Sequence, residues 1–166
     1  MPKLLSKKNY CKLIAVGSAV GLANYFLGCM KDNVAPPLTA VPSVYVAGSG
    51  IGNSIAAYFK NGMPASLTDG SLRASATAIA VAGNDVYVAG YEGGVAKYWK
   101  NGVAVTLEGA NDGGATSIAV SGNDAYVAGT EFSDNKYVAK YWKNGIAVNL
   151  TDGSSFGYVT SIFGAK

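Results

Sequence analysis

The chain of 166 residues contains no histidine, and this absence excludes several kinds of chemistry at once. Without histidine there is no Ser-His-Asp triad and no His-ligated zinc site. The sequence also has no glycine-rich phosphate-binding motif between a strand and a helix. We find no catalytic constellation, so we expect a protein that is not an enzyme and that carries no cofactor and no metal ion.

The alternative of an enzyme rests on carboxylates alone, since glycosidase chemistry needs only two of them. The candidates are Glu92, Glu108, Asp112, Glu131 and Asp134. Most of these residues fall in expected loops, where a carboxylate normally forms a solvated turn. We therefore prefer the non-enzymatic interpretation.

Cysteine is scarce, and both copies, Cys11 and Cys29, lie near the N-terminus. A basic opening is followed by a mostly apolar stretch, residues 13–27, which is too short for a membrane span and is typical of a targeting segment. Phe26-Leu27-Gly28-Cys29 resembles the lipobox of bacterial lipoproteins. The resemblance implies lipidation of Cys29 and removal of residues 1–28. An ordinary secretory signal or an uncleaved anchor is the alternative.

Residues 29–43 are expected to form a tether, because three prolines stiffen this stretch and remove backbone donors. Met30-Lys31-Asp32 resembles a short export signal of surface lipoproteins, although any polar tether has a similar composition. We expect the cell envelope as location, with an outer-membrane anchor through Cys29 and display at the cell surface. Which leaflet carries the anchor stays open.

Charge gives little indication of a nucleic-acid partner. The whole chain has thirteen Lys plus Arg and ten Asp plus Glu. Four lysines precede Cys29, so cleavage would leave nine basic residues against ten acidic ones. The basic balance therefore belongs to the targeting segment, and we expect no nucleic-acid binding.

From residue 44 onward the chain consists of internal repeats. Tyr98-Trp99-Lys100-Asn101-Gly102 recurs as Tyr141-Trp142-Lys143-Asn144-Gly145 and, more weakly, as Tyr58-Phe59-Lys60-Asn61-Gly62. Self-similarity at a period near 40 indicates a repeat architecture. The units span about residues 44–70, 71–110 and 111–153, with a partial unit at 154–166.

Each unit contains strand-like runs rich in Val, Tyr and Trp, and none has the apolar spacing of a helix. In the middle unit the runs cover residues 77–81, 86–89, 95–100 and 103–107. Asn101-Gly102 predicts a two-residue hairpin turn. The link between the second and third runs changes length in steps of two, which keeps side chains on the same face. The pattern favours an all-β fold of about three four-stranded antiparallel blades, as in a β-propeller.

The two repeated phrases, Tyr-Trp-Lys-Asn-Gly and Val-Tyr-Val-Ala-Gly, resemble those of exported, propeller-type bacterial lipoproteins. The resemblance covers roughly residues 44–163 and implies a fold and a compartment, but no activity. Three blades are fewer than the four to eight of natural propellers, so we expect an open arc. The first unit lacks a clear first run, with residues 38–41 as a doubtful one, and residues 158–163 form a first run with nothing after it. Two arcs joined end to end would make a homodimer with six blades.

Repetition also sorts the residues by role. Aromatic residues present in every unit are expected to pack between blades: Tyr45, Tyr87 and Tyr126, with Phe59, Trp99 and Trp142. The alternative is a lectin-like set of equivalent sites, one on each blade. Asp69, Asp112 and Asp152 are expected to form turns, and Lys60, Lys100 and Lys143 to be solvated. Residues that differ between units are candidates for a ligand-facing loop: Glu92, Glu131, Phe132, Asp134 and Tyr137.

These observations lead to three hypotheses about function. The first is a lipid-anchored protein of the cell envelope whose repeats present a non-enzymatic binding face for a glycan, a peptide or a partner protein. The second is a structural or assembly scaffold, or the first part of a longer propeller. The third, a two-carboxylate glycosidase, is the least favoured.

Overall fold

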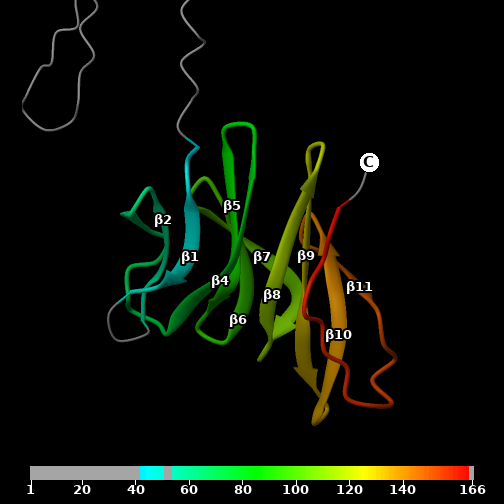
Figure 1. Ribbon diagram of the computed structural model, residues 1–166. Coiled ribbons are helices and arrows are strands. Elements are labelled where there is room, and N and C mark those ends of the chain that lie inside the picture. Colours follow the sequence, from blue (N-terminus) through cyan, green and yellow to red (C-terminus); the bar gives the residue numbers. More distant parts are fainter. Residues whose placement is uncertain (1–41, 51–53, 165–166) are drawn as a thin grey trace, which may run out of the picture. The chain divides into compact units, whose positions relative to one another are not determined.

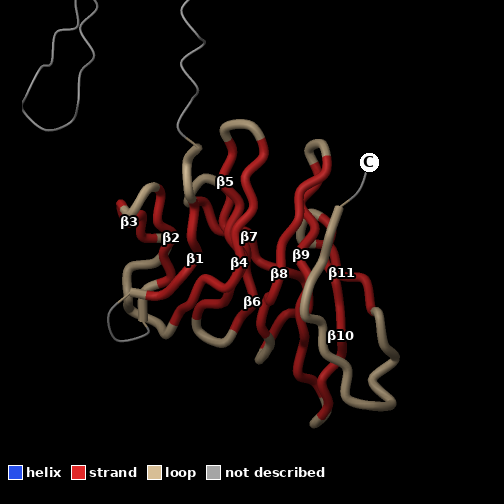
Figure 2. Tube along the Cα trace, viewed as in Figure 1, coloured by secondary structure: helices blue, strands red, loops and turns tan. Residues whose placement is uncertain are grey.

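The computed structural model describes residues 42–50 and 54–164, which all belong to one compact unit, Pro42–Lys166. The expected signal segment, most of the tether and Cys29 lie outside the described residues. Every regular element in the described part is a β-strand, as Figure 2 shows, so the all-β expectation is confirmed.

The strands form three separate antiparallel sheets that follow one another along the chain (Figure 1). Sheet 1 consists of β1 (Tyr45–Ser49), β2 (Ala56–Lys60) and β3 (Met63–Ser66). Sheet 2 consists of β4 (Ala74–Ala82), β5 (Asp85–Glu92), β6 (Val95–Lys100) and β7 (Val103–Asn111). Sheet 3 consists of β8 (Gly114–Ser121), β9 (Asp124–Ser133), β10 (Lys136–Lys143) and β11 (Ile146–Asn149).

The expected Asn-Gly turns are confirmed. Asn101 has a φ of 52° and Gly102 a φ of 83°, as a type I′ turn requires. The turns after β2 and β10 are alike, with Asn61 and Asn144 both at a φ of 51°. Glycine and asparagine tolerate this left-handed conformation better than other residues, which explains why the dipeptide recurs in all three units.

The core lies between neighbouring sheets. Trp99 and Val88 of sheet 2 face sheet 1 and are 1% exposed. Their counterparts Trp142 and Val127 of sheet 3 face sheet 2 and are 0% and 1% exposed. Sheet 2 is therefore covered on both faces. Alternate residues along its strands pack into two different hydrophobic cores, one on each face.

Two expectations about repeated residues need correction. Tyr126 and Phe59 are only half-buried, because each lies on a face of a terminal sheet that no described sheet covers. Trp99, Trp142 and Tyr87 are buried between sheets, so the repeated aromatic residues do not form an equivalent exposed site on each unit. Lys60 and Lys143 are exposed as expected, and Lys100 is partly exposed. Lys100 and Lys143 also form ion pairs with Asp85 and Asp124, at 3.1 and 2.7 Å.

The ends of the repeat array also differ from the expected pattern. Sheet 1 has three strands in the described part of the chain, and the doubtful first run at 38–41 lies outside it. Residues 158–164, which we call the terminal segment, form no strand. They lie along β8 instead: the Ile162 amide donates to Ser117 Oγ at 3.1 Å, and Thr116 Oγ1 donates to the Val159 carbonyl at 3.0 Å.

Candidate functional site

The hairpin β9–β10 is longer than its counterpart β5–β6, and this extra length holds the residues that set sheet 3 apart. In sheet 2 the last cross-strand pair is Glu92 with Val95. In sheet 3 the equivalent pair, Glu131 with Val138, is followed by two more pairs. Two additional pairs leave all remaining side chains of the hairpin on the same face of the sheet as in sheet 2, as the sequence spacing predicted.

The first added pair brings two aromatic rings together. Phe132 and Tyr137 lie opposite each other, with ring centroids 4.8 Å apart. Tyr137 also contacts Phe156 and Tyr158, at 5.9 and 5.3 Å between centroids. Tilted rings at these separations have the favourable geometry for aromatic pairs. We call these four residues the aromatic cluster.

Backbone hydrogen bonds hold the second half of the cluster in place. The Gly157 amide donates to the Tyr137 carbonyl at 2.9 Å, between the two exposed rings of Phe156 and Tyr158. Earlier in the same segment, the amides of Leu150 and Thr151 both donate to the Ala139 carbonyl, at 2.8 and 3.4 Å. The segment after β11 is thus tied along β10.

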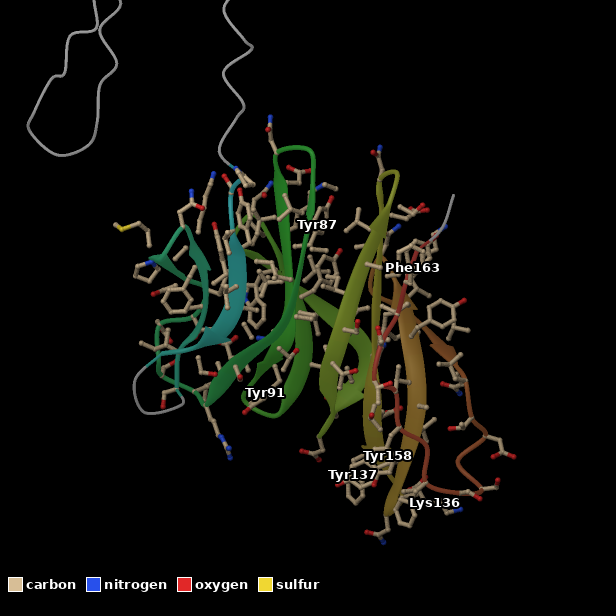
Figure 3. All side chains as sticks on the ribbon, viewed as in Figure 1. Tyr87, Tyr91, Lys136, Tyr137, Tyr158 and Phe163 are labelled. Carbon is tan, nitrogen blue, oxygen red and sulfur yellow. The ribbon has the colours of Figure 1, made fainter. Side chains whose placement is uncertain are left out.

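The outer rings of the cluster face solvent. Phe156 is 64% exposed and Tyr158 is 66% exposed, while Phe132 and Tyr137 are half-buried. Figure 3 shows Tyr137 and Tyr158 side by side at the end of sheet 3 that holds the β9–β10 turn. Folded proteins normally bury such rings, so two exposed rings packed on two half-buried ones indicate a contact surface.

A polar hollow of about 240 Å³ lies on the other face of the same hairpin. Residues alternate across the sheet, so Glu131, Lys136 and Lys140 point away from the aromatic cluster. The polar residues that line the hollow are Glu131, Ser133, Asp134, Lys136, Lys140, Asn149 and Asp152. The amide of Ser154 donates to Asp152 at 2.8 Å, and the Ser154 hydrogen bonds lower the pKa of that carboxyl.

The two glutamates predicted for the ligand-facing loop, Glu92 and Glu131, both form ion pairs with lysines of the same chain. Glu92 Oε2 accepts from Lys97 Nζ at 2.6 Å, and Glu131 pairs with the buried Lys140. Sheet 1 has Gly50 and Ala57 at the equivalent positions, so it contains neither member of this ion pair. Buried charges are normally paired, and each glutamate forms its ion pair with a lysine of the neighbouring strand in its own sheet.

The structure therefore divides the five candidate residues. Phe132 and Tyr137 belong to the aromatic cluster, Asp134 forms the turn beyond it with a φ of 51°, and Glu131 lies on the opposite face. Glu92 belongs to sheet 2 and not to this hairpin. Sequence reasoning missed Phe156 and Tyr158, although two aromatic residues absent from the corresponding links of the other units were a usable signal.

Within residues 42–50 and 54–164, no three His, Cys, Asp or Glu side chains are grouped closely enough to hold a metal ion. No helix in this part of the chain is long and apolar enough to cross a membrane. No protein-family model matches the sequence, and no curated protein is similar to it.

Proposed function

We propose that this protein binds glycans at the aromatic cluster of sheet 3, without catalysis, as a lipid-anchored protein of the cell envelope whose sheets are blades of a propeller-like arc. The proposal depends chiefly on the aromatic cluster, in which Phe156 and Tyr158 are exposed while Phe132 and Tyr137 are half-buried. The Gly157 amide ties the segment that carries Phe156 and Tyr158 to β10. Aromatic faces supply apolar contact area, and the tyrosine hydroxyls supply hydrogen bonds.

A rigid scaffold favours this use of the cluster. The hairpin that carries Phe132 and Tyr137 is held by eight cross-strand pairs, from Lys136–Ser133 to Lys143–Tyr126. Binding therefore requires little ordering of the rings, which reduces the entropic cost of association. Loops and hairpin ends on a fixed scaffold are a common location for binding sites.

Three of the five carboxylates considered for glycosidase chemistry form ion pairs or hydrogen bonds with other residues of the chain. This supports binding over catalysis. Glu92 and Glu131 hold lysine ammonium groups. Glu108 Oε2 accepts from the Ala147 amide at 3.2 Å. A general acid and its partner carboxylate need free oxygens directed at one glycosidic bond.

Glycan-array binding by the full chain tests the proposal. Tyr137→Ala should weaken binding by about tenfold or more, as expected when a central aromatic contact is truncated. Tyr137→Phe should retain most of the affinity, because it keeps the ring. The control is Phe163→Ala, which removes an exposed ring outside the cluster, 88% exposed and at the other end of sheet 3 (Figure 3).

Two results would contradict the proposal. One is the absence of any glycan bound above background. The other is glycan binding that Tyr137→Ala and Phe156→Ala both leave unchanged while the control behaves like the wild type. Binding to a peptide array in place of glycans would likewise reject the ligand class.

A further inference from the structure

The two ends of the sheet array carry complementary positions that no described residue fills. The repeats make this visible, because sheets 2 and 3 show how each position is filled inside the array. Three independent features can be compared: a glycine that accommodates a neighbouring strand, a threonine that joins adjacent sheets, and a pair of sheet faces.

The first feature is the glycine of the Val-Tyr-Val-Ala-Gly phrase. A Cβ added to Gly90 of β5 would lie 2.0 Å from the Ser75 carbonyl oxygen of β4. A Cβ added to Gly129 of β9 would lie 2.2 Å from the Gly114 carbonyl oxygen of β8. Only glycine lets the first strand of each sheet approach this closely.

Gly48 occupies the same position in β1, but no first strand lies beside it among the described residues. A Cβ added there would meet only the Phe59 ring, at an ordinary contact distance of 3.7 Å. The other edge of β1 is paired with β2. Gly48 is therefore suited to the approach of a strand that the described part of sheet 1 does not contain.

The second feature is a threonine that links one sheet to the next. Thr77 Oγ1 of β4 is 2.6 Å from the Ala115 carbonyl of sheet 3 and 3.1 Å from the Ala89 carbonyl of its own sheet. Thr116 of β8 repeats both contacts, at 3.0 Å to Val159 and 3.2 Å to Ala128. Val159 thus takes the place in the terminal segment that Ala115 has in β8.

Thr160 is the next threonine of this series, and it is exposed without a hydrogen-bond partner among the described residues. By the same offset, its acceptors would be the carbonyls of Ala47 and Ala76. Ala47 corresponds to Ala89 and Ala128, and Ala76 corresponds to Ala115 and Val159. Both acceptors lie at the far end of the array, in sheets 1 and 2.

The third feature is the exposure of the two outer faces. Val46 on the outer face of sheet 1 is 52% exposed, whereas its equivalents Val88 and Val127 are 1% exposed between sheets. Tyr126 on the outer face of sheet 3 is half-buried, while the equivalent Tyr87 is 3% exposed. The two outer faces are copies of surfaces that pack together inside the array.

We infer that a second copy of this chain fills these positions: residues 159–164 of one copy form, in the other copy, the first strand that the described part of sheet 1 lacks. The strand would pair antiparallel with β1, Ile162 opposite Val46, as Ile79 pairs with Val88 and Ile118 with Val127. Strand addition of this kind satisfies main-chain donors and acceptors on both partners.

Reciprocal donation between two copies closes a ring of six sheets. A head-to-tail interface gives either a closed ring or an open filament. Six is within the four to eight blades of natural propellers, whereas three copies would give nine. Each sheet face measures about 300 Å², from strand spacing and length, so the four faces of two junctions would bury about 1,200 Å². That area lies in the range of stable interfaces, roughly 1,200–2,000 Å².

Gly48→Ala is the sharpest test, because the structure offers room for the methyl group within one copy and none beside a donated strand. We expect the full chain, dispersed in mild detergent, to have the mass of two copies by light scattering. Gly48→Ala should weaken this dimer by about tenfold or more, because the added Cβ would overlap strand atoms. Its thermal unfolding as a monomer should match the wild type.

Two further variants examine the threonine. Thr160→Val should weaken the dimer roughly three- to tenfold, the effect of one lost hydrogen bond. Thr160→Ser keeps the hydroxyl and should behave like the wild type. Since Thr160 is exposed in one copy, neither variant should change folding.

A disulfide between copies tests the register. In the full chain with Cys11 and Cys29 replaced by serine, Val46→Cys and Ile162→Cys are placed on separate, differently tagged copies and co-expressed. The inferred pair is a non-hydrogen-bonded one, with Cα atoms about 4.5 Å apart, which suits a disulfide. Pairing Val46→Cys with Phe163→Cys is the control, because that side chain points to the opposite face.

Three results would overturn the inference. A monomeric wild type that loses folding stability on Gly48→Ala would show that residues of the same chain occupy the position beside β1. A mass that grows without limit as concentration rises would reject closure at two copies. Cross-linking that is no stronger for Ile162→Cys than for Phe163→Cys would reject the register.

Discussion

At the residue scale, the asparagine of each Asn-Gly turn does more than adopt a left-handed conformation. Asn101 Oδ1 accepts from the Val86 amide at 2.9 Å, and its Nδ2 donates to Asp85 at 2.8 Å. Asn144 repeats the second contact with Asp124 at 2.8 Å. Each asparagine thereby ties a hairpin turn to the start of a neighbouring strand, which glycine could not do.

These contacts also change how the two aspartates titrate. The Asn101 amide and the Lys100 ammonium lower the pKa of Asp85, and Lys143 and Asn144 lower the pKa of Asp124. A carboxyl with a depressed pKa stabilises the fold above its unfolded value, near 4. That contribution is lost as pH falls through the lower, folded value.

We therefore predict that the double variant Asp85→Asn/Asp124→Asn has a flatter acid profile than the wild type. Chemical denaturation at pH values from 7 down to 2 measures the effect. The wild type should lose stability below about pH 4, where the two carboxylates become protonated. The variant should be less stable at pH 7 and approach the wild type in acid. If the free energy of unfolding changed with pH equally in both proteins, these two carboxylates would not contribute to the acid sensitivity of the fold.

The turn conformations at this scale could be predicted from the sequence, whereas the side-chain bonds could not. Asn-Gly between two strand-like runs specifies a local geometry with few alternatives. The partner of Asn101, by contrast, lies 15 residues earlier in the chain. Its position depends on the register of a different hairpin, which a local pattern does not contain.

At the element scale, close approach of the first strand controls which glycines can be replaced. We predict that Gly90→Ala destabilises the protein by about 1–3 kcal/mol, the usual cost of forcing extra volume into a packed site. Its Cβ would overlap the Ser75 carbonyl at 2.0 Å, and backbone atoms cannot move aside easily. Denaturant unfolding monitored by tryptophan fluorescence gives the free energy.

Gly114→Ala is the matched control, since a Cβ there would meet nothing within 4 Å and the φ is not positive. It should change the free energy of unfolding by less than about 0.5 kcal/mol. If Gly90→Ala were as mild as this control, β4 could not lie as close to β5 as the structure has it.

Hairpin lengths follow from sequence at this scale, but the aromatic cluster does not. The spacing of the repeats predicted that the third link grows in steps of two, and the two added pairs of β9–β10 agree with it. Phe156 and Tyr158 join the cluster only because the segment after β11 turns back along β10. That path depends on the Gly157–Tyr137 hydrogen bond, and no repeating sequence pattern predicts it.

For the whole molecule, the sequence predicted about three units, and the described residues form three sheets because each repeat supplies the strands of one sheet. It did not predict how the terminal segment behaves. Residues 158–163 have the composition of a first strand, yet a strand needs a partner, and the described part of this chain offers β8 and its serine and threonine side chains instead. Composition alone cannot distinguish a strand from a segment suited to become one.

The anchor is a prediction about the whole molecule that depends on Cys29 alone. The basic opening, the short apolar stretch and Phe26-Leu27-Gly28-Cys29 lead us to expect a lipidated cysteine after cleavage. Metabolic labelling of expressing bacteria with a fatty-acid probe should mark the wild type and leave Cys29→Ala unmarked. Cys11→Ala is the matched control: Cys11 lies in the part that cleavage would remove, so this variant should be labelled like the wild type. Equal labelling of Cys29→Ala and the wild type, or loss of label on Cys11→Ala alone, would contradict the lipoprotein assignment while leaving glycan binding and strand donation to their own tests.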